Sequence, residues 1–143
     1  MENSLKELLV LLRSMQLYYH NCHQITNGAN FVGDHSLFSD FYKQIEGEYD
    51  SVAERTIGLF GVGLLSLKGI IERVEDQLES LQEPEQNSPE NMFAQGGLLE
   101  VRLQDWCDII GTNEQVTIGT QNLIAQIADN SEARLYKIRQ RLS

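Results

Sequence analysis

Apolar residues recur every three or four positions over most of the chain, which is the period of amphipathic helices. The first such stretch covers residues 4–23, the second covers 34–60, the third runs from 88 to about 110, and the fourth begins at 119–120 and reaches the C-terminus. A shorter periodic segment lies at 65–81. The pattern predicts an all-α fold, a four-helix bundle with one short extra helix in its crossover connection.

Local signals place the ends of these helices. Ser4 with Glu7 matches a capping box, and Asp34 and Thr120 are natural caps for the second and fourth helices. The run TNGAN at 26–30 breaks the first helix, and glycines follow the second. The polar stretch at 82–91 contains both prolines and reads as a connection before the third helix.

Length and charge narrow the class of protein. A chain of 143 residues suits one domain over 1–143. The net charge of −10 repels phosphate backbones, which argues against DNA binding. A mild basic cluster near the C-terminus is best read as cations that complement the dipole of the last helix, with nucleic-acid contact as the minority alternative. Its members are Arg134, Lys137, Arg139 and Arg141.

Cysteines and hydropathy bear on the compartment. Cys22 and Cys107 have neither metal-site spacing nor the pattern of a disulfide framework, so we expect buried thiols in a reducing compartment. The apolar run LLVLL near the N-terminus is too short to span a membrane. We therefore expect a cytoplasmic protein with no membrane partner.

Metal-type ligands lie in the first third of the chain. With about 100° per residue, Asp50 and Glu54 lie roughly 60° and 100° from His35 around the second helix, so the three share a face. His23 falls within the apolar stripe of the first helix and needs a polar partner there. Asp50 and Glu54 form an i, i+4 pair whose carboxylates project to one spot. Pattern alone leaves the ordinary alternative open, a solvated acidic face beside a satisfied core histidine.

The distance between these residues suggests how a site would form. His35 and Asp50 are separated by roughly 22 Å along the helix axis, so one ion cannot contact both in one chain. Two copies of the second helix, packed antiparallel about a two-fold axis near Gln44 and Ile45, would bring His35 of one chain to Asp50 and Glu54 of the other. Imidazole and carboxylate donors without thiolate suit Fe(II), Mn(II) or Zn(II).

The same residues resemble the signature of the Dps family of ferritin-like mini-cages. HQITNGANFVGDH at 23–35 and DSVAER at 50–55 carry the resemblance, and SLKGIIERVEDQL at 66–78 is similar to the family's short middle helix. The resemblance implies a ferritin-like four-helix bundle and a homododecameric shell. It also implies Fe(II) oxidation at two-fold interfaces, often with hydrogen peroxide, and storage of Fe(III) inside. The matching positions for metal binding and catalysis are His23, His35, Asp50 and Glu54.

Three features depart from that family pattern. Ser39 stands where the family has a third ligand, an aspartate, in the first subunit, so we expect weaker metal binding, or one metal in place of two. The segment 109–119, near the family's three-fold pores, has Glu114 as its only acid. The lysine-rich tail of many DNA-binding members is absent from this sequence. The alternative function is a Dps-like structural shell with weakened or lost ferroxidase activity, and a helical adaptor is a more distant reading.

Overall fold

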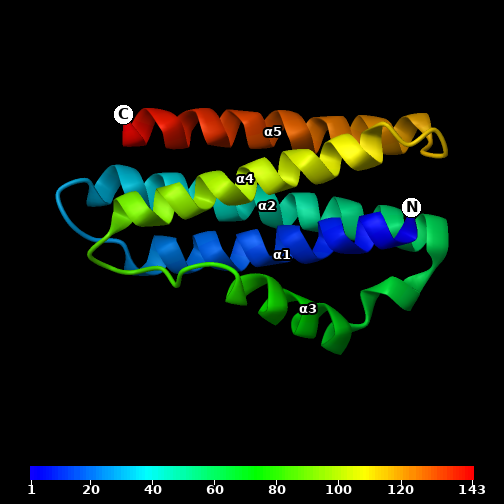
Figure 1. Cartoon of the computed structure of the whole chain (residues 1–143), viewed down its shortest axis with the longest axis horizontal. Helices are drawn as coiled ribbons and strands as arrows, with labels where there is room; N and C mark the ends of the chain where they lie inside the picture. Colours follow the sequence, from blue (N-terminus) through cyan, green and yellow to red (C-terminus); the bar gives the residue numbers. More distant parts are fainter.

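The structure, a computed structural model, describes residues 1–143 and contains helices but no strands. Four long helices and a short one account for most of the chain, with a single 3-10 turn before the short helix (Figure 1). Their bounds are α1 Glu2–Ile25, α2 Phe31–Phe60, η1 Val62–Leu65, α3 Leu67–Glu79, α4 Pro89–Gly111 and α5 Ile118–Leu142.

The connection between α2 and α4 sets the topology of the bundle. α1 and α2 form an antiparallel pair, as do α4 and α5, and α3 lies outside the bundle along α1 (Figure 1). Because α3 carries the chain back to the end where α2 began, α2 and α4 run in the same direction. The predicted all-α four-helix bundle with a short helix in its crossover connection is confirmed.

Three predicted helix caps are wrong. Ser4 lies inside α1, whose N-cap is Met1. α2 begins at Phe31, so Asp34 lies in its first turn, where it is buried and accepts two hydrogen bonds from Arg141. The cap of α5 is Thr117, whose hydroxyl accepts a hydrogen bond from the backbone N–H of Thr120. In each case the predicted cap is a polar residue three or four positions after the true cap.

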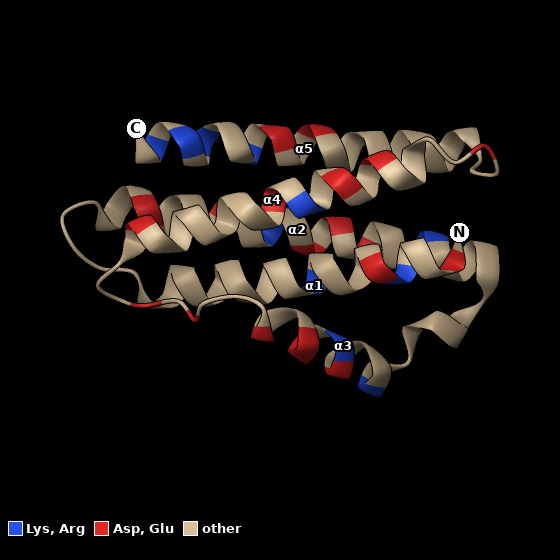
Figure 2. Cartoon of the chain, viewed as in Figure 1, with Lys and Arg blue, Asp and Glu red and all other residues tan.

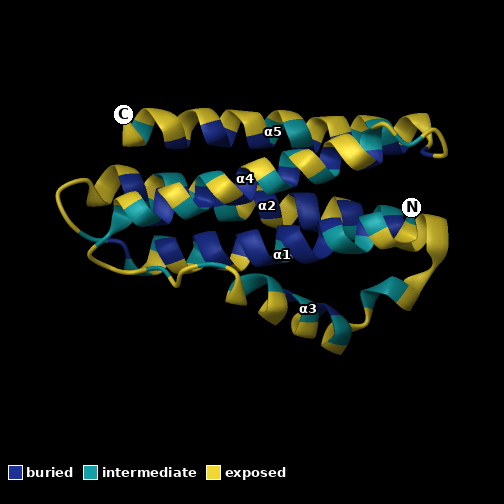
Figure 3. Cartoon of the chain, viewed as in Figure 1, coloured by how far each residue is buried: buried dark blue, intermediate teal, exposed yellow.

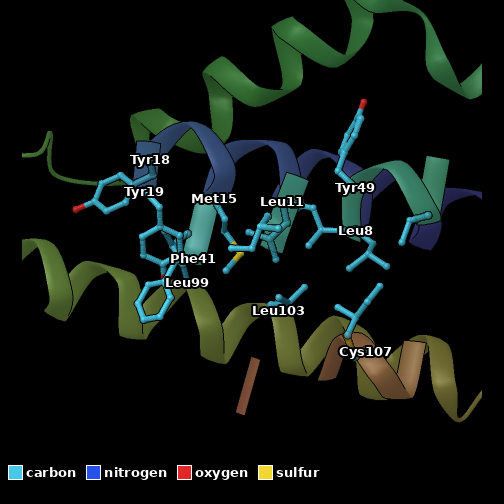
Figure 4. Close-up of a cluster of buried hydrophobic side chains, with 14 of the residues drawn as sticks. Leu8, Leu11, Met15, Tyr18, Tyr19, Phe41, Tyr49, Leu99, Leu103 and Cys107 are labelled. Atoms are coloured by element: carbon cyan, nitrogen blue, oxygen red, sulfur yellow. The ribbon is translucent and has the colours of Figure 1, made fainter. Parts of the chain in front are cut away.

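The core fills the space between the four long helices. Buried faces turn toward the bundle axis and exposed faces turn outward, with α3 exposed along its outer side (Figure 3). Leucine, methionine and aromatic side chains from α1, α2 and α4 interdigitate in the close-up of Figure 4. Gly96 lets α4 approach α1 closely, because a Cβ there would lie 2.9 Å from the ring and hydroxyl of Tyr19. The largest fully buried side chains include Tyr19, Phe38, Phe41, Phe93, Leu5, Leu8 and Leu9.

The remaining sequence expectations concern thiols, membranes and basic residues. Both cysteines are free and buried, and no helix has the length and apolar character needed to cross a bilayer.

The basic residues near the end of α5 stand out against acids spread over the other helices (Figure 2). The reading of Arg134 as a last-turn cation that complements the helix dipole is wrong, because the last turn of α5 holds Arg139 and Arg141, while Arg134 is only 2% exposed and pairs with Glu48 and Glu100.

Candidate metal centre

The turn between α1 and α2 brings His23 and His35 together. Gly28, at φ 100°, takes the left-handed conformation that lets the chain reverse within a few residues. Its carbonyl accepts a hydrogen bond from the N–H of Phe31, the first residue of α2. The last turn of α1 thus lies against the first turns of α2, and the two imidazole rings stack with centroids 3.8 Å apart.

Each imidazole is oriented by the backbone of the other residue. His23 Nδ1 donates to the carbonyl of His35 at 2.9 Å, and His35 Nδ1 donates to the carbonyl of His23 at 2.8 Å. Because a carbonyl oxygen only accepts, both Nδ1 atoms carry a proton, and in the neutral ring the lone pair then lies on Nε2. This is the arrangement that fixes the tautomer and the ring plane of histidines that bind metals.

Aromatic rings surround the histidine pair. Phe31 stacks on His35 with centroids 4.8 Å apart, and Tyr42 lies 5.4 Å from the ring of His23. His20 stacks on Tyr42 at 4.2 Å, but its ring centroid is 6.3 Å from that of His23. His20 therefore lies beside the pair as a ring packed on Tyr42.

The two candidate carboxylates lie elsewhere on α2. Asp50 and Glu54 are exposed, whereas His35, near the start of α2, and His23, in the last turn of α1, are half-buried. No group of three or more His, Cys, Asp and Glu side chains in the chain is arranged to hold a metal ion. Ser39, one turn after His35, offers a hydroxyl where a carboxylate would add charge. The structure therefore brings together the two histidines of the predicted site and leaves the two carboxylates apart.

Cys22 is adjacent to His23 but does not join the pair. Its side chain is fully buried, and burial raises the pKa of the thiol far above its ordinary value. A protonated thiol is a poor metal ligand. The sequence prediction that Cys22 is not a ligand agrees with this environment.

A second group of acidic side chains lies inside the bundle, and the sequence analysis missed it. Glu100 is fully buried, receives two hydrogen bonds from Arg134 Nε at 2.9 and 3.1 Å, and accepts one from Tyr19 at 2.6 Å. Arg134 Nη1 donates to Glu48 at 2.8 Å and to Gln44 at 2.7 Å. Helical spacing placed Glu100 and Arg134 on the apolar faces of α4 and α5, and that signal could have found the cluster.

Charge balance explains how these groups are tolerated. Burial raises the pKa of Glu48 to about 7, although Arg134 opposes the rise. Burial alone would lower the pKa of Arg134, but Glu100 and Glu48 outweigh it and raise the net value. The guanidinium thus occupies the centre of the acidic cluster, so these carboxylates already have their cation and are not a metal site in this chain.

Comparisons with known proteins agree with this architecture. No family model matches the chain. A DNA protection during starvation protein from Brevibacillus brevis is 31% identical over 80 residues, which is 50% of this chain and 54% of that protein, so the chain spans about half the length of this curated relative. A Dps1 mutant from Mycobacterium smegmatis has a TM-score of 0.76 at 17% identity, covering 99% of this chain and 94% of that one. A Dps protein from Vibrio cholerae, described as a member of a superfamily of ferritin-like diiron-carboxylate proteins, gives 0.77 at 19%, covering 99% and 88%.

The fold of this chain is that of the ferritin-like helical bundles, since both structural matches extend over nearly all of its length. The Brevibacillus protein and the two solved structures are all Dps proteins, so the chain is similar to Dps proteins over half of its length in sequence and over nearly all of it in fold. The resemblance to the Dps family predicted from the sequence is confirmed.

Proposed function

We propose that the chain binds Fe(II) between two copies of itself, oxidises it, and stores the Fe(III) product inside a shell. The observation that carries the proposal is the histidine pair, with both Nδ1 atoms tied to backbone carbonyls and both Nε2 lone pairs free. Two imidazoles and two carboxylates without thiolate form a donor set that fits Fe(II). The residues present therefore suit iron as the substrate.

The partner subunit supplies the carboxylates in this proposal. If two α2 helices pack antiparallel about the midpoint between Gln44 and Ile45, His35 of one chain lies opposite Glu54 of the partner subunit. Asp50 of the partner subunit then lies opposite Ser39, one turn further along α2. The two-fold axis creates two equivalent sites per dimer.

The carboxylates and the histidines have different roles in iron oxidation. Asp50 and Glu54 neutralise the charge of Fe(II) and favour the higher charge of Fe(III), while His23 and His35 fix the ion from the other side. Two Fe(II) ions each give one electron to one molecule of hydrogen peroxide. The peroxide O–O bond breaks as it is reduced to two hydroxide ions, and hydrolysis of the two Fe(III) ions then releases protons.

Exposed apolar side chains support self-association into the shell. They lie at the two ends of α2, on η1 and α3, and along α4, where a monomer would leave them in water. Exposed apolar surface of this extent is typical of protein interfaces. We therefore propose a homododecamer built through two-fold contacts. The relevant side chains include Val32, Ile57, Phe60, Val62, Leu67, Ile71, Leu98 and Ile109.

A second candidate function rests on Ser39. A hydroxyl in place of a carboxylate removes one negative charge beside the cation, which weakens binding and leaves Fe(III) less stabilised. On this alternative the protein forms the same shell but oxidises iron slowly or not at all.

Iron loading separates the proposals. Fe(II) and peroxide added to the assembled protein should give oxidation faster than in buffer and an electron-dense core in particles of about twelve chains of 16.3 kDa each. Particles of that mass without faster oxidation would favour the inert shell. A mass of one or two chains would rule out both and favour a helical adaptor.

Ser39→Asp is expected to raise the initial rate of Fe(II) oxidation by about tenfold or more, because it restores a carboxylate one turn from His35. Stopped-flow absorbance with peroxide measures the rate. Ser51→Asp is the matched control, since Ser51 is exposed on α2 but rotated away from the site. Equal rates in Ser39→Asp and the native protein would show that Ser39 does not lie at the site.

A further inference from the structure

Two opposite charges flank the point on α2 about which the proposed dimer is symmetric. Lys43 and Glu46 are both exposed. They are three residues apart, yet neither takes part in any of the chain's ion pairs. Around the helix they lie roughly 80° and 20° from His35, inside the arc that contains the candidate ligands. The inference drawn from these charges rests on the dimer of the proposed function.

An antiparallel two-fold places these charges opposite each other. Lys43 lies as far before the midpoint of Gln44 and Ile45 as Glu46 lies after it. In an antiparallel pair, residues equally distant from the axis face one another, so Lys43 of each chain meets Glu46 of the partner subunit. The midpoint was placed from the positions of the candidate ligands alone. The positions of the two charges agree with it independently.

The apolar ends of α2 match the same midpoint. Val32 is 82% exposed and lies opposite Ile57 of the partner subunit, which is 40% exposed in a single chain. Phe31, which stacks on His35, lies opposite Gly58 of the partner subunit, where no side chain stands in the way. Apolar contacts at this end would cover the histidine pair and exclude water from it.

Shifting the two helices by about one turn removes this complementarity. A shift of three residues in one direction puts Glu46 against Glu46 of the partner subunit. The same shift in the other direction puts Lys43 against Lys43 of the partner subunit. Like charges facing each other at an interface are strongly unfavourable, so the alternative registers are penalised while the one that assembles the ligands is favoured.

We propose that Lys43 and Glu46 form two reciprocal ion pairs across the two-fold axis and fix the register that aligns the histidines of one chain with the carboxylates of the other. They are positioning residues, because they act on the metal through the placement of α2. Each of the two residues lies only one and a half positions, about 2 Å along α2, from the axis.

A charge-reversal cycle tests this role. Lys43→Glu and Glu46→Lys each put like charges across the axis, and each should weaken the two-fold dimer by about tenfold or more at low ionic strength. The double variant restores both pairs with reversed polarity and should recover the native dissociation constant. Sedimentation gives the association, and calorimetry with Zn²⁺ as the only metal gives the affinity of the site. Lys137→Glu on α5 controls for the change in net charge.

Three outcomes decide the result. Recovery in the double variant, with losses in each single variant that shrink at high salt, supports the register. Single variants that associate and bind Zn²⁺ like the control overturn it, as does a double variant no better than the singles.

Disulfide cross-linking tests the register of the two α2 helices in the absence of metal. Lys43→Cys protein mixed with Glu46→Cys protein should form a disulfide-linked heterodimer under mild oxidation, since the native cysteines are buried. Absence of that product, with free exchange between the two proteins, would overturn the register. Because neither association nor cross-linking depends on iron, a protein that passes both tests but fails to oxidise Fe(II) would refute only the proposed function.

Discussion

Glu54→Ala is expected to reduce the rate of Fe(II) oxidation by about a hundredfold or more, to near the rate in buffer. Glu54 is the carboxylate that would face His35 of the partner subunit, and its loss removes a charge that favours Fe(III) over Fe(II). Because the side chain is exposed in the single chain, its removal should leave helicity and thermal stability unchanged. Stopped-flow oxidation with peroxide, together with Zn²⁺ calorimetry, measures both effects.

Glu132→Ala is the matched control for this variant, since Glu132 is an exposed glutamate on α5 away from the predicted site. It should oxidise Fe(II) at the native rate. If Glu54→Ala and Glu132→Ala behave alike in both oxidation and Zn²⁺ affinity, Glu54 is not a ligand and the site has been placed wrongly.

Arg134→Met is expected to lower the free energy of unfolding by about 3–5 kcal/mol. The change removes the cation that pairs with Glu100, which is fully buried, and with Glu48, which is nearly so. The carboxylate that accepts the hydrogen bond from Tyr19 then carries an unbalanced charge. Urea denaturation followed by circular dichroism at pH 7 measures the difference. Arg134→Lys should recover only part of it, because an ammonium cannot reproduce the fork of contacts to Glu100 and Glu48.

The deficit in Arg134→Met should shrink as the pH is lowered. Burial raises the folded-state pKa of Glu48 above its value in the unfolded chain, and loss of the guanidinium removes the charge that opposes this rise. The folded state then binds more protons than the unfolded state between those values, so protonation stabilises the variant as the pH falls through that window. If Arg134→Met lowers the free energy of unfolding by less than about 1 kcal/mol at pH 7, Arg134 is not needed to balance the charges of the buried carboxylates.

The helices were predictable because each buries one stripe of apolar residues at the helical period. Their exact starts were not, since a polar residue inside the first turn looks like a cap in the sequence. Asp34 is an example: its carboxylate accepts a hydrogen bond from Arg141, which is more than one hundred residues away in the chain. Only the packing of α5 against the start of α2 decides between the two roles.

The candidate site was predictable in part. Spacing placed His35, Asp50 and Glu54 on one face of the second helix, whereas the approach of His23 to His35 became clear only from the turn at Gly28 in the structure. The reciprocal hydrogen bonds to backbone carbonyls depend on how closely α1 and α2 pack, which a sequence pattern does not specify. Arg134 was misread because a basic residue near a helix end suits the dipole equally well, and its partners come from two other helices.

The intersubunit origin of the site is tested most directly by mixing two inactive variants, His35→Ala and Glu54→Ala, in assemblies purified through a different tag on each chain. In a mixed dimer one site carries both defects, while the other combines His35 of one chain with Glu54 of the partner subunit and is intact. Random pairing makes about half of the dimers mixed, so the assemblies should oxidise Fe(II) at about a quarter of the native rate. If the mixture stays at the rate of the separate variants although mixed dimers have formed, each site lies within one chain and the account is wrong.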